Sequence, residues 1–453
     1  MPFRKAAVYF VAMSSKPFTR LSAPAQASPG LILCGFASLA IWLAGLFVPE
    51  LFGRALSSLI VRPGPVSLDT GPLWLLLLLF VPYAAAFVVA TRRPRPHDGA
   101  VIAIFAALSC LALVLRERPM ATHDLFLYIF QGRAAALHGL NPYAIVPAGV
   151  ADPFVAEMGK WLSGLKNTYG PLWTTLAAGI AALVGDRPVA LVYAFKIAAA
   201  AFFLACIPLV AALRANVAGP SPRPANAGFL LLFAWNPALL FEAVQNGHND
   251  IAMIFFLLLA LILAIRGRSG TAGAALAASF LIKYVSVLCV PVFAAYALSR
   301  APRGGRLRAL AAFFAPLVLL TVGAFVPYWR GAGASVLDGL AAQSSLVGID
   351  VASPFAFSLA YAYARGTKLI FAQETVDAVT GASFLAFAVA TAAVVAFSFL
   401  RRLDARDFVR CAFAPIACYL AFACFWFMPW YLAWLAPILA IEEAAAAAFA
   451  AAA

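Results

Sequence analysis

The chain has 453 residues, of which 64% are hydrophobic and only 11% are charged. Apolar runs of about 17 to 25 residues recur along it, which is the length needed to cross a bilayer core. This excludes a soluble globular domain and predicts an all-α, polytopic transmembrane bundle. The formal net charge of +14 does not indicate a nucleic-acid partner, because Lys and Arg cluster in short loops, where they set membrane orientation.

The predicted spans follow one another in a single transmembrane domain, residues 31–445, that would hold about 11 to 13 helices. The N-terminal tail, 1–30, is basic, and no cleavage-site pattern follows the hydrophobic span that begins near Leu31. We therefore expect a retained cytoplasmic tail rather than a cleaved signal peptide. A low-complexity tail, 446–453, ends the chain. Full-length spans are predicted at 31–49, 73–90, 99–115, 188–213, 227–244, 249–265, 307–329, 378–400, 408–427 and 429–445, with shorter apolar pieces at 171–184 and 271–299.

Clusters of arginine predict which loops are cytoplasmic. Three such clusters stand out: Arg92, Arg93 and Arg95; Arg300, Arg303, Arg306 and Arg308; Arg401, Arg402, Arg406 and Arg410. The loops 116–170 and 330–377 then fall on the extracytoplasmic side. Residues 171–213 need an odd number of crossings between their flanking loops, so either 171–184 is interfacial or the loop 214–226 is assigned to the wrong side.

The stretch 271–299 lies between two basic loops but is too short for two full helices. We therefore expect a helical hairpin with Lys283 and Tyr284 at its tip, since broken backbone at membrane depth is tolerated where it lines a cavity.

The acidic residues gather on one predicted face of the membrane. Those that map to the extracytoplasmic loops or their rims are Glu117, Asp124, Asp152, Glu157, Glu242, Asp250, Asp338, Asp350, Glu374 and Asp377. Any chemistry should therefore face outward.

The stretch ATHDLFLYIFQGRAAALHGLNPY, residues 121–143, opens the first large outer loop. Polar residues recur on one side of a predicted amphipathic helix that would lie along the interface, with Asp124 pointing away from lipid. A purely structural role is also open, with Thr122 as the N-cap and Asp124 as a first-turn acid. Arg133 could equally bind lipid phosphates or a substrate.

The stretch FAWNPALLFEAVQNGHNDIAM, residues 233–253, breaks a hydrophobic helix at Pro237. The polar residues that follow are Glu242, Gln245, Asn246, His248, Asn249 and Asp250. Such a density of polar groups is costly near lipid unless they face a cavity, although a hydrated turn is the alternative. A metal site is disfavoured because a single histidine among these acids lacks the regular spacing of a hydrolytic centre.

Lys283 lies in the apolar stretch SFLIKYVSVL, where a buried ammonium needs an anion or water. A lysine that snorkels to the membrane surface is the alternative. The aromatic residues of NTYGPLW (167–173) and WFMPWYLAWLAP (426–437) predict either an interfacial belt or surfaces for sugar stacking. Nucleotide fingerprints are absent, so we expect no nucleotide cofactor.

Five motifs in order carry a resemblance: HDLFLYIFQGRAAALHGLNPY, YGPLW, WNPALLFEAVQNGHND, SFLIKY and PWYLAW. Together they resemble the bacterial polyprenyl-phosphate-mannose-dependent mannosyltransferases, integral membrane glycosyltransferases of the GT-C fold. The resemblance implies that Asp124 is the catalytic residue and that Lys283 and Arg133 bind the donor phosphate. The residues that it implies in substrate binding are His123, Tyr128, Tyr169, Glu242, Asn246, His248, Asp250, Tyr284 and Trp430.

The resemblance further implies transfer of a hexose, with mannose as the first expectation, from a polyprenyl-phosphate donor to a hydroxyl of a glycan or glycolipid. Transfer would occur on the extracytoplasmic face of the inner (plasma) membrane by inverting displacement, with Asp124 as general base and without a metal or cofactor. A transporter or flippase of a lipid-linked sugar is the alternative. The one-sided acids and the lack of an internal repeat disfavour it. An acyl- or phosphoethanolamine-type transferase is disfavoured because no His-rich or Thr-nucleophile signature is present.

Overall fold

The computed structural model describes residues 27–47, 71–116, 119, 122–218, 227–338, 353–365 and 372–442. The described residues are helical with no strand, which confirms the predicted all-α membrane bundle. The helical segments long and apolar enough to cross a membrane are Asp98–Leu115, Pro188–Ala218, Arg303–Leu337 and Gln373–Leu400. A helix pair bent by 46°, Ala227–Ala234 and Pro237–Gln245, would make a further span. Residues 1–26 of the predicted tail 1–30, and all of the predicted tail 446–453, lie outside the described residues.

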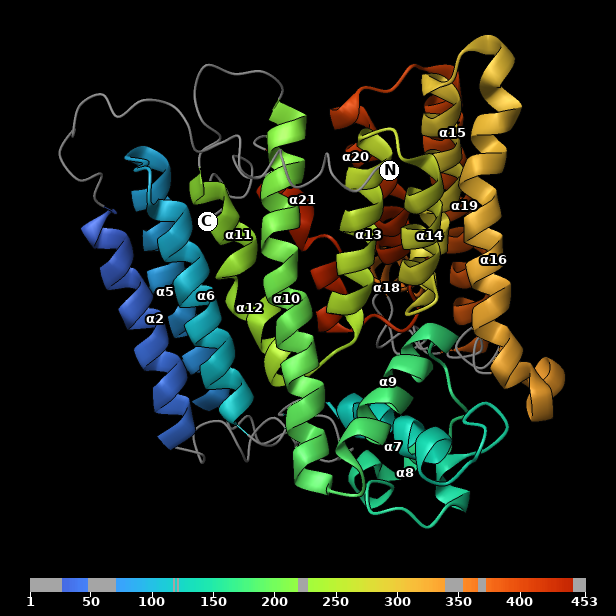
Figure 1. The fold of residues 1–453 in the computed structure, drawn as a ribbon, viewed down its shortest axis with the longest axis horizontal. Helices are drawn as coiled ribbons and strands as arrows, with labels where there is room; N and C mark the ends of the chain where they lie inside the picture. Colours follow the sequence, from blue (N-terminus) through green and yellow to red (C-terminus); the bar gives the residue numbers. More distant parts are fainter. Residues whose placement is uncertain are drawn as a thin grey trace, which may run out of the picture.

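The helices form two groups around a long central helix (Figure 1). The first group is α2 (Pro29–Phe47), α5 (Gly71–Arg92) and α6 (Asp98–Leu115). The centre is α10 (Pro188–Ala218), with α11 (Leu231–Ala234), α12 (Pro237–Leu240) and α21 (Ala436–Ile441). The second group is α13 (Asp250–Ile265), α14 (Ser269–Phe280), α15 (Val290–Arg300), α16 (Arg306–Ala332), α18 (Pro354–Tyr363), α19 (Gln373–Leu400) and α20 (Ala405–Cys418).

Short helical segments of other geometry join these elements. The 3-10 segments are η1 (Pro147–Gly149), η2 (Ala156–Met158), η3 (Ala227–Leu230), η5 (Tyr284–Cys289), η6 (Arg303–Gly305), η7 (Gly333–Leu337) and η11 (Pro429–Trp434), and the π-helical segments are η4 (Phe241–Gln245) and η10 (Tyr419–Ala423).

Three helices lie together at one end of the bundle (Figure 1). They are α7 (Asp124–Ala136), α8 (Gly159–Ser163) and α9 (Pro171–Val184), and with their connections, residues 122–187, we call them the cap layer. The turns α5–α6, α15–α16 and α19–α20, which carry the arginine clusters, lie at the opposite end (Figure 1). The basic loops and the first acidic loop are therefore on opposite sides of the bundle, as predicted.

The beginning of the second large loop joins the cap layer. The side-chain amide of Asn141 donates to the carbonyl oxygen of Tyr328 at 2.6 Å, and the ammonium of Lys166 pairs with Asp338, also at 2.6 Å. The two predicted outer loops therefore share one side, as far as residue 338; residues 339–352 and 366–371 lie outside the described part.

The position of helix α9 bears on the two alternatives for residues 171–213, an interfacial segment 171–184 or a wrongly assigned loop 214–226. The helix packs on α7 within the cap layer, and α10 alone then runs the length of the bundle (Figure 1). The structure thus supports an interfacial position for 171–184 and a single crossing by α10.

Helix α7 differs from the expected amphipathic helix. Every residue from Leu125 to Ala134 is buried, including the apolar side that was predicted to face lipid. One cause is the close approach of α9: a Cβ at Gly132 would lie 2.4 Å from the carbonyl oxygen of Ala177. Phe126 also stacks on Phe154, with ring centroids 6.2 Å apart. The expectation that the apolar side of α7 faces lipid is therefore wrong, because protein covers that side.

The predicted hairpin is confirmed. Helix α14 ends at Phe280, Lys283 is extended at φ −143° and ψ 121°, and the chain returns through η5 and α15. The tip is tied to the start of α9, since the backbone N–H of Gly170 donates to Ile282 at 3.2 Å and that of Leu172 donates to Leu281 at 3.1 Å. The cap layer therefore fixes where Lys283 stands.

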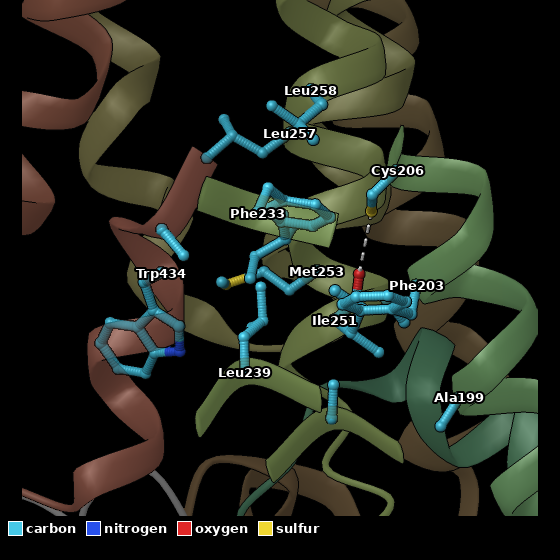
Figure 2. Close-up of a cluster of buried hydrophobic side chains, with 14 of the residues drawn as sticks. Ala199, Phe203, Cys206, Phe233, Leu239, Ile251, Met253, Leu257, Leu258 and Trp434 are labelled. Atoms are coloured by element: carbon cyan, nitrogen blue, oxygen red, sulfur yellow. Dashed lines mark hydrogen bonds between the residues drawn. The ribbon is translucent and has the colours of Figure 1, made fainter. Parts of the chain in front are cut away.

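A cluster of buried apolar side chains packs around the N-terminal half of α13 (Figure 2). Phe203 of α10 stacks on Phe233 of α11, with centroids 5.4 Å apart at 12°, and the thiol of Cys206 lies 3.9 Å from the carbonyl oxygen of Ile251. Lipid tails are as apolar as these side chains, so close packing rather than exclusion of water holds such a core together. Trp434 borders it and carries its indole nitrogen toward α13 (Figure 2).

Lys196, for which the sequence suggests no role, is fully buried in α10. Its ammonium donates to the carbonyl oxygen of Leu113 at 2.8 Å and to that of Arg116. These carbonyls end α6, where a cation is favoured by the helix dipole. The lysine therefore joins α10 to the end of α6.

Candidate active site

Asp124 stands in the first turn of α7, where the helix dipole favours a carboxylate. The N-cap residue is His123 rather than Thr122, although the hydroxyl of Thr122 accepts from the backbone N–H of Asp124 at 3.1 Å. Asp124 is therefore a first-turn acid as predicted, but Thr122 accepts from the N–H of Asp124 without being the N-cap residue. This arrangement leaves the carboxylate of Asp124 free to meet other elements.

The carboxylate of Asp124 meets one residue from the cap layer and one from the central bundle. The hydroxyl of Tyr169, just before α9, donates to Oδ2 at 3.0 Å. The ring nitrogen Nδ1 of His248 lies 3.6 Å from the same oxygen. The side chain of Asp124 is 16% exposed, so it is not sealed in the core.

Tyr169 is a hydrogen-bond donor to this carboxylate at neutral pH. Burial raises the pKa of Tyr169 well above its ordinary value, and the nearby Asp124 and Tyr128 raise it further. Tyr128 supports Tyr169 from behind, with ring centroids 4.9 Å apart and its own hydroxyl donating to Asn249 at 3.3 Å. Since Tyr128 is fully buried, the structure places it behind Tyr169.

Glu242 and His248 are brought together by an irregular backbone. The side chain of Asn236 accepts from the backbone N–H of Leu239, Pro237 starts α12, and the chain then widens into the π-helical segment η4. Gly247 follows with φ +68°, a conformation that favours glycine. As a result, Nε2 of His248 lies 3.4 Å from Oε2 of Glu242.

Asn246 and Trp430 fix the two groups. The side-chain amide of Asn246 donates to Oε2 of Glu242 at 2.7 Å. The ring of Trp430 stacks on that of His248, with centroids 4.3 Å apart at 21°. This contact favours Trp430 as a residue of the candidate site over an interfacial belt, because its ring packs on His248.

Lys283 lies inside the protein rather than at a lipid surface. Its ammonium donates to Oδ1 of Asp250 at 2.7 Å and lies 4.7 Å from the ring centroid of Tyr431 and 5.3 Å from that of Trp434. The indole of Trp434 donates to the same oxygen of Asp250. The snorkelling alternative is therefore wrong, because the ammonium has an anionic partner and two aromatic faces within the fold.

Tyr431 and Trp434 were missed as partners of Lys283. They are three residues apart on η11, so that both rings lie on one side of a 3-10 helix. Their centroids are 4.3 Å apart. This spacing in PWYLAW is a signal that the sequence does contain.

Arg133 and His123 are engaged away from Asp124. The guanidinium of Arg133 donates to Asp152 at 2.7 Å and to Asp186 at 2.6 Å, and it is nine residues further along α7, or about 14 Å at 1.5 Å per residue. The hydrogen bond from Arg133 lowers the pKa of the exposed Asp186 carboxyl. His123 lies with Nδ1 2.6 Å from the carbonyl oxygen of Glu157.

Tyr284, at the hairpin tip, hydrogen-bonds the hydroxyl of Tyr143 rather than a residue of the Asp124 group. Of the predicted residues, the structure brings together Asp124, Tyr169, Glu242, Asn246, His248 and Trp430. Asp250 follows two residues after His248 and pairs with Lys283 of the hairpin tip. We call these eight residues the candidate site. Within the described ranges, no group of three His, Cys, Asp or Glu side chains is arranged to hold a metal ion.

Parts of the chain are similar to known mannopyranosyltransferases. Alpha-(1->6)-mannopyranosyltransferase A of Corynebacterium glutamicum is 26% identical over 174 residues, which are 38% of this chain and 34% of that protein. Alpha-(1->6)-mannopyranosyltransferase A of Mycobacterium tuberculosis is 21% identical over 261 residues, 56% of this chain and 49% of that protein. The matched segments thus span half or less of these relatives.

No solved structure matches the chain. A family model described as "Alpha-(1->6)-mannopyranosyltransferase, N-terminal domain" matches residues 36–299, more than half of the 453 residues. This range holds seven of the eight residues of the candidate site, all but Trp430. The chain therefore belongs to the alpha-(1->6)-mannopyranosyltransferase N-terminal domain family.

Proposed function

We propose that the protein transfers a mannosyl unit from a polyprenyl-phosphate donor to a hydroxyl of a glycan or glycolipid acceptor. In this proposal, transfer takes place at the extracytoplasmic face of the plasma membrane, with the cap layer on that side. The observation that carries the proposal is the partly exposed carboxylate of Asp124, which Tyr169 orients and His248 approaches, in a chain of this family. Two residues after His248, Asp250 holds the ammonium of Lys283. The names of the relatives support mannose as the sugar.

Asp124 is the general base in this proposal. Among the described residues, Tyr169 and His248 both approach Oδ2 of Asp124, so Oδ1 is the oxygen that accepts the proton of the acceptor hydroxyl. The freed oxygen attacks the anomeric carbon as the bond to the phosphate breaks. This single displacement inverts the anomeric carbon, and a β-linked mannosyl phosphate gives an α-linked product.

Lys283 stabilises the charge on the departing phosphate. An ammonium has three donors, and Asp250 uses one of them, so Lys283 can still donate to a phosphate oxygen. Arg133 is the second candidate for this task, but two carboxylates already bind its guanidinium. Phosphate binding by Arg133 stays a prediction with less support from the geometry.

Trp430 would offer an aromatic face to a sugar ring, and Glu242 and Asn246 would accept from or donate to sugar hydroxyls. Asp250 would act mainly through Lys283. For His123, Tyr128 and Tyr284 a direct substrate contact stays a prediction, since their side chains are engaged elsewhere in the structure.

The test uses the purified full chain with polyprenyl-phosphate-mannose and an oligomannoside, in the presence of EDTA. We expect product without added divalent metal, and a loss of at least about 100-fold in kcat for Asp124→Asn. Asp338→Asn is the matched control, because this exposed acid lies in the cap-layer region but pairs with Lys166. Near-wild-type activity of Asp124→Asn would refute the assignment, and movement of the donor across vesicles without transfer would favour the transporter.

Lys283 is tested through donor binding. We expect Lys283→Met to weaken donor affinity and slow transfer, and Lys283→Arg to retain part of both because the positive charge remains. Thermal unfolding of the variants shows whether the unpaired Asp250 has disturbed the fold. Unchanged donor affinity and rate in a folded Lys283→Met variant would remove this lysine from the phosphate site.

A further inference from the structure

Two tryptophans stack on each other where the cap layer meets the C-terminal part of the bundle. The rings of Trp161, in α8, and Trp426, in the segment between η10 and η11, have centroids 5.0 Å apart at 18°. Trp161 is 49% exposed and Trp426 is partly buried. Each ring covers one face of the other, and Trp161 keeps an open aromatic surface. We call these two residues the tryptophan pair.

Helix α8 holds Trp161 in place without burying it. Met158 and Leu162, on either side of it in the sequence, are 2% and 8% exposed and pack into the main apolar core. The segment before the helix is tied to the candidate site as well. Nδ1 of His123 lies 2.6 Å from the carbonyl oxygen of Glu157, and His123 directly precedes the candidate general base.

Trp426 is fixed from the side of the bundle. The carbonyl oxygen of Cys424 accepts from the backbone N–H of Ser353 at 2.9 Å, which ties this segment to the start of α18. Four residues after Trp426, the ring of Trp430 stacks on that of His248 in the candidate site. Four residues of extended chain span at most about 14 Å. The tryptophan pair therefore stands beside the candidate site.

The 3-10 helix η11 divides the candidate site into two sides. Consecutive residues of a 3-10 helix point about 120° apart, since it has three residues per turn. Tyr431 and Trp434 both lie near the ammonium of Lys283, whereas Trp430 packs on His248. Lys283 holds the donor phosphate in the proposed function. The side that Trp430 shares with the tryptophan pair is thus the one left for the acceptor.

We propose that the tryptophan pair is a subsite for the acceptor glycan, in which the open face of Trp161 stacks on a sugar unit distant from the one that is mannosylated. The ligand class is a chain of neutral hexopyranose units. The inference deepens the proposed function and rests on it, because that function supplies a glycan acceptor. It adds that the protein favours longer acceptors over shorter ones.

A flat aromatic face suits a pyranose ring. The C–H groups of a sugar ring pack on an aromatic face while its hydroxyls stay in water, and burying apolar surface is favourable. Stacking on Trp426 already holds the ring of Trp161 in place, so little side-chain entropy is lost on binding. Within the described part of the chain, the buried indole N–H of Trp430 has no acceptor, so it can donate to a hydroxyl of the same glycan.

The bilayer interface, where tryptophan is enriched, is the other possible occupant. An interfacial tryptophan needs no partner ring. Trp329, near the end of α16, is 52% exposed and has no aromatic partner among the described residues. Trp161, in contrast, is stacked and adjoins a segment that continues to Trp430. These features favour the glycan.

The test compares acceptors of two lengths, with the full chain and polyprenyl-phosphate-mannose. The acceptors are α-(1→6)-linked mannobiose and mannotetraose, which have the linkage in the names of the relatives. We expect the KM of the wild-type chain to be about 10-fold lower for mannotetraose, and Trp161→Ala to remove most of this difference by raising that KM. The KM for mannobiose, the KM for the donor and kcat should stay unchanged. Trp161→Phe should retain part of the preference, because an aromatic face remains.

Trp329→Ala is the matched control, since it removes an exposed tryptophan outside the tryptophan pair and should change neither acceptor KM. An unchanged KM for mannotetraose in a folded Trp161→Ala variant, or an equal rise for both acceptors, would overturn the subsite. A raised donor KM in both Trp161→Ala and Trp329→Ala, with the length preference intact, would assign the pair to the bilayer interface instead.

Binding without transfer separates the subsite from the proposed function. Saturation-transfer NMR measures the affinity for mannotetraose in the absence of donor, and we expect it to be about 10-fold weaker in Trp161→Ala. If the wild-type chain binds mannotetraose through Trp161 but transfers no mannose from this donor, the proposed function fails and the glycan subsite stands. If transfer occurs but neither KM nor affinity for mannotetraose depends on Trp161, the subsite alone fails.

Discussion

At the scale of single residues, Arg133 can be tested for two different roles. Its side chain is 3% exposed and joins Asp152, whose side chain is fully buried, to Asp186 in the α9–α10 turn. Removing one partner of a buried pair leaves an uncompensated charge. We therefore expect Arg133→Met to lower the free energy of unfolding by about 3 to 5 kcal/mol, measured by chemical or thermal unfolding in detergent.

Lys166→Ala provides the comparison for that measurement. It breaks an ion pair with the exposed Asp338 in the same layer, and exposed pairs contribute little to stability. We expect no measurable change in the unfolding of this variant. A folded and fully stable Arg133→Met that has lost donor affinity would contradict the structural role and favour the phosphate contact instead.

The sequence indicates the chemically important residues of the candidate site better than it indicates their partners. Asp124 and Lys283 stand out because a charge in an apolar chain is costly. The structure pairs Lys283 with Asp250, 33 residues earlier, and places the rings of Tyr431 and Trp434 of η11 near its ammonium. Such pairings depend on how helices pack across the bundle, and no local pattern encodes them.

At the scale of elements, the contact between α9 and the hairpin tip is the junction that sets the candidate site. A Cβ at Gly170 would lie 2.0 Å from the carbonyl oxygen of Leu281, which is backbone and cannot move aside alone. Gly170 has φ −69°, so alanine would suit its conformation and the cost would be steric. We expect Gly170→Ala to destabilise the protein by about 1 to 3 kcal/mol and to reduce transfer, measured by unfolding and by the mannosyltransferase assay.

Gly179 offers a control on the same helix. A Cβ there meets no atom within 4 Å, so Gly179→Ala should be neutral or should stabilise α9 by up to about 1 kcal/mol. If Gly170→Ala behaved like Gly179→Ala in both assays, the close contact with Leu281 would not be what holds Lys283 in place.

Elements were predictable where one physical rule governed them. The hairpin at Lys283 and Tyr284 follows from the length between two basic loops, and the structure confirms the break there. The expected lipid contact of α7 was wrong because a hydrophobic side in a membrane protein can face either lipid or protein, and the pattern does not distinguish them.

At the scale of the whole molecule, the arrangement of charge divides the bundle into two ends. The arginine-rich turns lie at one end and the cap layer with the candidate site at the other (Figure 1). The family match agrees with the resemblance found in five separate motifs, and neither depends on the membrane orientation. Orientation rests on the rule that arginine-rich loops stay in the cytoplasm, which is a rule about insertion and not about the folded state.

Labelling of introduced cysteines tests this orientation directly. Lys160, in α8, and Gly304, in the α15–α16 turn, are both exposed and lie at opposite ends of the bundle. The partly buried native cysteines, Cys34 and Cys418, are replaced by alanine to lower the background. In spheroplasts, we expect a membrane-impermeant maleimide to label Lys160→Cys at once and Gly304→Cys only after the membrane is opened. The reverse pattern would place the cap layer and Asp124 in the cytoplasm, where the donor would have to present its sugar on the inner leaflet. The proposed outward-facing transfer would then be wrong, even though the geometry of the candidate site would stand.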